Sequence, residues 1–176
     1  AYDNGNDFEA REKMHNASTM AGMAFGNAFL GISHSMAHKI GGRYEIPHGR
    51  INAILLPHVI LYNGKVPSKL STWPKYQYYI ADFKYMELAQ AIGLNPKNKE
   101  EGVKMFAKAC YDLGLSIGIE MSLSKQGVSE KDFLENSLNL AYLAYEDQCS
   151  TANPKLPLVN DMKAILENAY YGKLTK

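Results

Sequence analysis

Apolar residues recur every three to four positions along most of this sequence, and that helical spacing constrains the fold more than any other feature. We find no convincing segment in which apolar and polar residues alternate between turn signals, as they do in half-buried strands. Residues 99–118 show the helical pattern best, with an apolar stripe that contains Val103, Phe106, Ala107, Cys110 and Leu113. The sequence therefore predicts an all-α fold of about seven or eight helices.

Capping residues, glycines and prolines mark the ends of the expected helices. A first helix runs from a cap at Asp7 towards Phe25. A second covers residues 31–40 and stops at the glycine pair 41–42. A third begins after a proline and covers residues 48–63, with another proline inside it. The remaining segments are a loop over residues 64–74 and helices over residues 76–92, residues 99–118, a stretch after Ser129 and residues 158–171.

The sequence contains no repeat, low-complexity tract or obvious domain boundary, so we interpret residues 1–176 as one helical domain that carries both a metal site and a substrate pocket. Residues 17–28 are rich in Ala, Gly, Met and Ser, and small residues let another backbone approach closely. We therefore expect this segment to be buried. The chain opens without methionine in a polar segment, as a piece of a longer protein or a processed protein would.

Charge and hydropathy exclude several classes of partner. The net charge is +1 with 21% charged residues and no basic run, so we expect no nucleic acid. No apolar stretch approaches the roughly 20 residues of a membrane span, and the N-terminus lacks the features of a signal peptide. The 2 cysteines, Cys110 and Cys149, are far apart in the sequence. Free thiols in a reducing compartment are therefore expected, and with them a cytoplasmic location.

The clearest candidate site is a histidine cluster: three of the 5 histidines, His34, His38 and His48, fall within fifteen residues. Imidazole is a common ligand for iron and zinc, and it also transfers protons. The first two lie four apart and share a helix face, and the third can return to them if the glycines turn the chain. A cluster of ordinary hydrogen-bonded histidines remains the alternative. His15 and His58 have no such neighbours and are interpreted as structural.

Other motifs are less informative. No G-x-G-x-x-G or Walker-type loop occurs, so the sequence shows no dinucleotide- or phosphate-binding fingerprint of its own. Cys110 lies on an apolar helical face and is expected in the core. Cys149 lies in a polar loop without a charge that would obviously lower its pKa, so a reactive thiol and a pocket-lining residue both remain open.

The histidine cluster lies within a longer pattern that is similar to a known family. Residues 21–42, which include Phe25-Gly-Asn-Ala and His34-Ser-Met-Ala-His38, resemble the second signature of the iron-dependent alcohol dehydrogenases, as does Ile46-Pro-His48-Gly. Residues 9–18 and 146–154 further resemble the alcohol dehydrogenase half of the bifunctional aldehyde-alcohol dehydrogenases of fermentative microbes. The similarity covers essentially the whole chain.

This resemblance implies roles for particular residues. That family binds one divalent metal, usually iron, through one Asp and three His between two domains, and the similarity assigns two of these ligands to His34 and His48. It places His38 beside the nicotinamide, in a catalytic role linked to proton transfer, rather than on the metal. It places Phe25 and Cys149 in the substrate pocket. Zinc remains possible, since both metals accept imidazole.

The resemblance also implies that part of the enzyme is missing. The family's other Asp and His ligands belong to an upstream D-x-x-x-H motif, and its NAD-binding domain lies further upstream. This sequence contains neither, and it also lacks the acylating aldehyde dehydrogenase half. The chain is therefore expected to be the helical C-terminal domain of the enzyme, partnered by the missing N-terminal domain. We expect the isolated chain to bind iron weakly and to be inactive.

The implied activity is the NAD-dependent, iron-dependent reduction of a short aldehyde such as acetaldehyde to its alcohol. Two alternatives belong to other classes. The chain could serve as an assembly or interaction module, because the bifunctional relatives form homo-oligomers and helical filaments. It could also be a stand-alone metal-binding helical protein that uses His34, His38 and His48 together with water.

Overall fold

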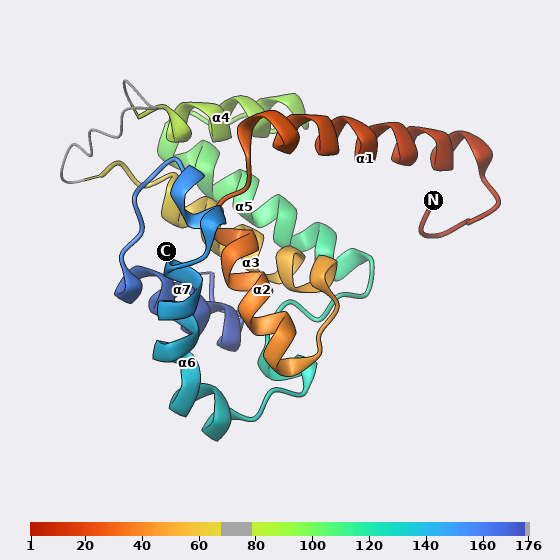
Figure 1. Cartoon of the computed structure of the whole chain (residues 1–176). Helices are drawn as coiled ribbons and strands as arrows, with labels where there is room; N and C mark the ends of the chain where they lie inside the picture. Colours follow the sequence, from red (N-terminus) through yellow and green to blue (C-terminus); the bar gives the residue numbers. More distant parts are fainter. Residues whose placement is uncertain (68–78, 175–176) are drawn as a thin grey trace. The chain divides into compact units, whose positions relative to one another are not determined.

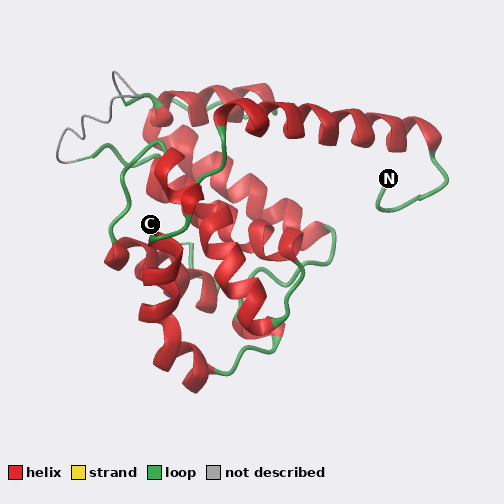
Figure 2. Ribbon diagram, in the orientation of Figure 1, coloured by secondary structure: helices red, strands yellow, loops and turns green. Residues whose placement is uncertain are grey.

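The computed structural model describes residues 1–67 and 79–174, and within these ranges it consists of helices and loops without strands (Figure 2). The expected all-α fold is thus confirmed. The expected loop over residues 64–74 and the start of the helix expected over 76–92 lie partly outside the described residues. The longer helices are α1 (Phe8–Ala28), α2 (Ile32–Tyr44), α3 (His48–Asn63), α4 (Ala81–Ala91), α5 (Lys99–Ser116), α6 (Glu130–Tyr145) and α7 (Val159–Tyr171), with short 3-10 helices η1 (Ser124–Gln126) and η2 (Gln148–Ala152).

Contacts divide the chain into two compact units, Ala1–Leu30 and Gly31–Lys176. The first unit is α1 with its flanking residues. Asp7 caps α1 as expected, because its carboxylate accepts a hydrogen bond from the Ala10 N–H at 3.0 Å. The expectation that residues 17–28 are buried is wrong, since no residue of α1 is buried. Small residues permit close packing, but a single helix offers them no partner within its own unit.

The second unit is built around one apolar core. Ile32, Met36 and Ile40 recur at four-residue spacing along α2, and all three are 0% exposed. They pack with apolar residues of α3, α6 and α7, helices that lie against one another (Figure 1). A smaller cluster between α3 and α5 contains Ile60, Val103 and Ala107. Helices α5, α6 and α7 therefore pack against α2 or α3 and fix the two helices that carry the clustered histidines.

Helix α2 is longer than expected. The chain continues helically through Gly41 and Gly42 to Tyr44, and the helix ends at Glu45, which adopts the left-handed conformation with φ 53°. Each helical glycine costs up to about 1 kcal/mol, a cost that tertiary packing of a buried face readily offsets. A Cβ at Gly41 would lie 3.2 Å from the Ile46 carbonyl oxygen, so glycine lets the chain return closely along the end of α2.

Helix α3 begins at His48, directly after Pro47, and keeps Pro57 inside it, as expected. Helix α4 begins only at Ala81, so residues 79–80 of the helix expected over 76–92 are not helical. Among the described residues, no helix combines the length and the apolar character that crossing a membrane requires.

Two buried amides connect the ends of α2 and α3 to the loop that follows η2. The Asn153 Nδ2 group donates to Asn63 Oδ1 at 2.8 Å and to the Lys155 carbonyl at 2.6 Å. Its Oδ1 accepts from Asn63 Nδ2 at 3.2 Å and from the Ile32 N–H at 3.4 Å. Ile32 opens α2 and Asn63 closes α3, so this pair anchors the η2 loop to both helices.

Candidate functional site

The second unit brings the three clustered histidines together. His34 and His38 lie one turn apart on α2, and His48 opens α3 after the chain turns back. Their ring centroids are 5.3 Å apart for His34 and His48, 5.4 Å for His38 and His48, and 6.3 Å for His34 and His38. The expected return of His48 is therefore confirmed, although the chain turns after Glu45 and not at the glycine pair, which stays helical. The separate metal and catalytic roles of the three residues stay predictions.

Neighbouring polar side chains orient His48. The Ser33 hydroxyl donates to Asn52 Oδ1 at 3.0 Å, which fixes the direction of the Asn52 amide. The Asn52 Nδ2 group lies 3.1 Å from His48 Nε2 and 3.2 Å from the His48 carbonyl oxygen. Asn52 sits one turn after His48 on α3 and Ser33 lies on α2, so this chain of bonds links the two helices at the site. Sequence reasoning did not identify either residue.

The donor set fits a divalent transition metal. His34 is half-buried, and its pKa is lowered first by burial and then by the neighbouring His48 and His38. A lowered pKa favours neutral imidazole, which is the form that binds iron or zinc. His34 and His48 together supply two nitrogen donors, and a complete site requires further ligands.

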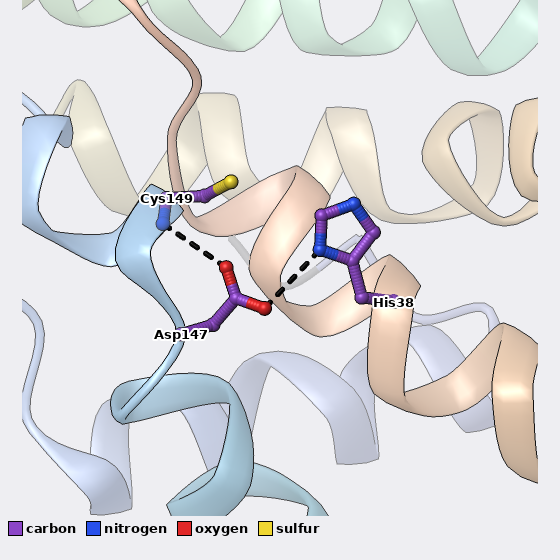
Figure 3. Close-up of side chains that lie close together, drawn as sticks. All are labelled: His38, Asp147 and Cys149. Carbon is purple, nitrogen blue, oxygen red and sulfur yellow. Dashed lines mark hydrogen bonds and ion pairs between the residues drawn. The ribbon is translucent and has the colours of Figure 1, made fainter.

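A carboxylate that sequence reasoning missed completes the polar network. Asp147 Oδ2 lies 3.2 Å from His38 Nδ1 and 2.9 Å from Lys39 Nζ, and Asp147 Oδ1 accepts from the Cys149 N–H at 3.0 Å (Figure 3). Burial alone would raise the pKa of Asp147, but the bonds from Lys39, Cys149 and His38 outweigh it and hold the pKa well below its usual range. The carboxylate is therefore ionised at neutral pH.

The only signal for Asp147 in the sequence was its place before η2, where Asp is a common cap. That signal predicts local structure and says nothing about a histidine 109 residues away.

Cys149 is a buried thiol at the edge of this network, with 2% of its surface exposed. Burial, together with the hydrogen bond and the charge of Asp147, raises its pKa to about 11. The thiol is thus protonated at neutral pH, which argues against a reactive thiolate and leaves the pocket-lining role as the prediction. Cys110 is partly buried against the smaller core cluster, near its expected place.

His38, Asp147 and Cys149 could themselves be taken for a metal site, since each offers one ligand atom and these atoms lie within 4.8 Å of one another. However, the Asp147 carboxylate already pairs with the Lys39 ammonium, and the thiol would have to lose its proton beside that carboxylate. We therefore interpret this group as a hydrogen-bonded network and His34 with His48 as the better metal-binding pair.

The other predicted residues lie elsewhere. Phe25 belongs to α1, in the first unit, with 49% of its surface exposed, and its role in the substrate pocket stays a prediction. His15 also lies on α1 and is exposed. His58 is buried in α3, and no hydrogen-bond partner reaches its Nε2. Burial lowers the pKa of His58 to about 4, so it is neutral and structural, as expected.

Comparison with known proteins shows one family. Residues 1–170 match the family model described as the C-terminal part of the Fe-containing alcohol dehydrogenase family. The aldehyde-alcohol dehydrogenase of Streptococcus pneumoniae is 63% identical over 166 residues, which are 94% of this chain and 19% of that protein. The bifunctional aldehyde-alcohol dehydrogenase of Escherichia coli is 42% identical over 167 residues, or 93% of this chain and 19% of the relative.

Solved structures agree with this result. The alcohol dehydrogenase from Oenococcus oeni matches with a TM-score of 0.80 and 33% identity, covering 95% of this chain and 39% of that one. A 1,3-propanediol oxidoreductase matches with a TM-score of 0.78 and 33% identity, covering 94% and 39%. The chain thus spans about a fifth of the length of these curated relatives, 19% in each case.

Proposed function

The chain belongs to the Fe-containing alcohol dehydrogenase family, and from this we propose that it is the helical C-terminal part of an iron-dependent, NAD-dependent enzyme that reduces a short aldehyde such as acetaldehyde. The observation that carries the proposal is the convergence of three imidazole rings, with centroids 5.3–6.3 Å apart, from α2 and α3. Such a cluster suits a metal-assisted reaction that also moves a proton.

In this proposal His34 and His48 hold the metal, and the remaining ligands come from a part of the enzyme outside this chain. When bound, iron supplies Lewis acidity that polarises the aldehyde carbonyl and stabilises the developing alkoxide. Zinc could supply the same chemistry. In this structure the Asn52 Nδ2 group faces the His48 Nε2 lone pair, so a metal bound through Nε2 would take the place of that hydrogen bond.

The other residues have distinct tasks. His38 would exchange a proton with the substrate oxygen, and a nicotinamide bound by the missing N-terminal domain would supply the hydride chemistry. Cys149, as a neutral thiol, contacts a small aldehyde or alcohol, and the resemblance gives Phe25 of the first unit a substrate-pocket role as well. The buried thiol supports this assignment, because a protonated sulfur contributes apolar surface without competing as a nucleophile.

Titration of the purified chain with ferrous iron, without oxygen, tests the ligand assignment. We expect binding weaker than micromolar, because two imidazoles give an incomplete site, and His34→Ala or His48→Ala should abolish it. The matched control is His15→Ala, an exposed histidine in the other unit, which should change nothing. Micromolar or tighter binding by the unmodified chain would contradict an incomplete site.

The variant His38→Ala separates this proposal from a stand-alone metal-binding protein. Metal affinity should hardly change if His38 serves catalysis, and it should collapse if His38 is a ligand. An assay of NADH oxidation with acetaldehyde and ferrous iron completes the test. The isolated chain should be inactive, and activity at its mass of 19.6 kDa would overturn the need for the missing domain.

A second candidate function is an assembly or interaction module in a homo-oligomer or filament. It is favoured by α1, which has no buried residue and exposes apolar side chains such as Phe8 and Met20, 85% and 68% exposed. Light scattering across a range of concentrations tests this function. A strictly monomeric chain at high concentration would count against it.

A further inference from the structure

The Asp147 carboxylate is held by a donor on each of its oxygen atoms. Oδ1 accepts from the Cys149 N–H at 3.0 Å, and Oδ2 faces both Lys39 Nζ at 2.9 Å and His38 Nδ1 at 3.2 Å. The side chain is 10% exposed, so little water competes for these bonds. Because Asp147 also caps η2, its backbone is fixed by the same local structure. A carboxylate restrained in this way presents Oδ2 to His38 in a defined direction.

This geometry determines where the hydrogen lies on the His38 ring. An ionised carboxylate offers only acceptors, so the ring nitrogen that faces it must carry a hydrogen. A neutral His38 is then the Nδ1–H tautomer, with the lone pair on Nε2. Figure 3 shows the second ring nitrogen on the side of the ring away from Asp147. The nitrogen left for chemistry thus points away from the carboxylate.

We propose that Asp147 is a positioning residue that holds His38 as the Nδ1–H tautomer, so that Nε2 is the nitrogen that exchanges a proton with the substrate oxygen. This inference rests on the proposed function of His38. In the alcohol-oxidation direction, the O–H bond of the alcohol would break as its proton bonds to the Nε2 lone pair, and a nicotinamide held by the missing domain would accept the hydride. The Nδ1–H bond stays on the side of Asp147, and aldehyde reduction would run through the same bonds in reverse.

The carboxylate contributes in two ways to this step. It prevents the ring from turning Nδ1 towards the substrate, and it stabilises the positive charge that forms on the ring when Nε2 takes a proton. Lys39 Nζ lies 2.9 Å from Oδ2 and helps to keep the carboxylate ionised, and so keeps it an acceptor for His38. The competing interpretation is that Asp147 and Lys39 form an ordinary ion pair that ties the η2 loop to α2.

The tautomer of His38 distinguishes these interpretations. Nitrogen-15 NMR of the chain with labelled histidine, at pH 9 and without metal, cofactor or substrate, reports which ring nitrogen carries the hydrogen. The comparison with His38→Gln assigns the signals. We expect the Nδ1 resonance of His38 in the range of a protonated ring nitrogen. An unprotonated Nδ1 in the unmodified chain would overturn the proposal, and this measurement does not depend on any variant of Asp147.

Variants then test the cause. Asp147→Ala should shift the Nδ1 resonance to the unprotonated range, and Asp147→Glu should restore part of the Nδ1–H population. The matched control, Asp132→Ala, removes another carboxylate of the same region, one that pairs with Arg43 and should leave the His38 signals unchanged. Circular dichroism confirms that each variant is folded. Retention of Nδ1–H in a folded Asp147→Ala chain would overturn the proposal.

The two proposals can fail separately. A chain that shows the Nδ1–H tautomer but whose iron binding is unaffected by His34→Ala and His48→Ala would contradict the proposed ligands and support the role of Asp147. The opposite result, with the expected iron binding but an Nε2–H tautomer on His38, would contradict the role of Asp147 and support the metal site.

Discussion

The buried amide pair of Asn63 and Asn153 makes a quantitative prediction about the stability of the second unit. Asn153→Ala removes a side chain that is 6% exposed and forms two hydrogen bonds with Asn63, one with the Lys155 carbonyl and a weaker one with the Ile32 N–H. Asn63 is 3% exposed, so solvent does not replace these partners. At about 1–3 kcal/mol for each unsatisfied buried group, we expect a loss of about 2–4 kcal/mol in the free energy of unfolding.

A double-mutant cycle isolates the pair itself. Asn63→Ala should cost a similar amount, and the double variant should lose less than the sum of the single losses by about 0.5–3 kcal/mol, because both single changes break the same two bonds. Urea denaturation followed by circular dichroism measures each value. The control is Thr151→Ala, an exposed residue of η2, which should change stability by no more than about 0.5 kcal/mol.

Additive losses in this cycle, or a loss below about 1 kcal/mol for Asn153→Ala, would refute the reasoning. The result bears on the site because Ile32 opens the helix that carries His34, Asn63 closes the helix that begins at His48, and Asn153 follows Cys149 by one turn of chain. Loosening this anchor should therefore disturb the histidine cluster and the Asp147 network together.

Further predictions concern pH, packing and thiol reactivity. The folded pKa of His58, about 4, lies below its unfolded value of 6.5, so the stability that depends on its neutral form is complete above pH 6.5 and falls as the pH drops. Between pH 6.5 and 5 the unmodified chain should lose about 1.6 kcal/mol more than His58→Leu, measured by urea unfolding at both values. Phe133→Ala removes a fully buried ring whose centroid lies 4.3 Å from that of Tyr170, and it should lower the free energy of unfolding by about 3–5 kcal/mol in the same assay. The control Leu134→Ala, at an exposed neighbour, should lower it far less. Cys149, with a pKa near 11, should react with iodoacetamide at pH 8 far more slowly than a free cysteine, and rapid labelling of the folded chain would contradict its protonated, buried state.

Local signals predicted the framework of the site well. The helix predicted over residues 31–40 and the proline before His48 placed α2 and α3 nearly where they are. A four-residue spacing put His34 and His38 on one face, because side chains four apart on a helix are neighbours regardless of the rest of the fold. Of these two helices, α2 differed at its end, since packing of its buried face outweighs the cost of the glycine pair.

Long-range partners could not be predicted in this way. Asp147 meets His38 across 109 residues, and Asn153 meets Asn63 across 90. Neither pair has a periodic pattern or a local motif, because such contacts depend on how helices pack rather than on neighbouring residues. The expected burial of residues 17–28 failed for a related reason, since composition indicates that a segment can be packed but does not supply the partner.

The separation between His38 and Asp147 also has a consequence for synthesis of the chain. At about 5–20 residues per second, a ribosome needs roughly 5–20 seconds to translate the 109 residues between them. For most of that interval the three clustered histidines have already been made. Asp147, which pairs with His38 and Lys39, and the η2 loop have not. His48 can meet Asn52 and Ser33 early, since all three lie within residues 33–52. The hydrogen bond that restrains His38 can form only after translation has passed Asp147.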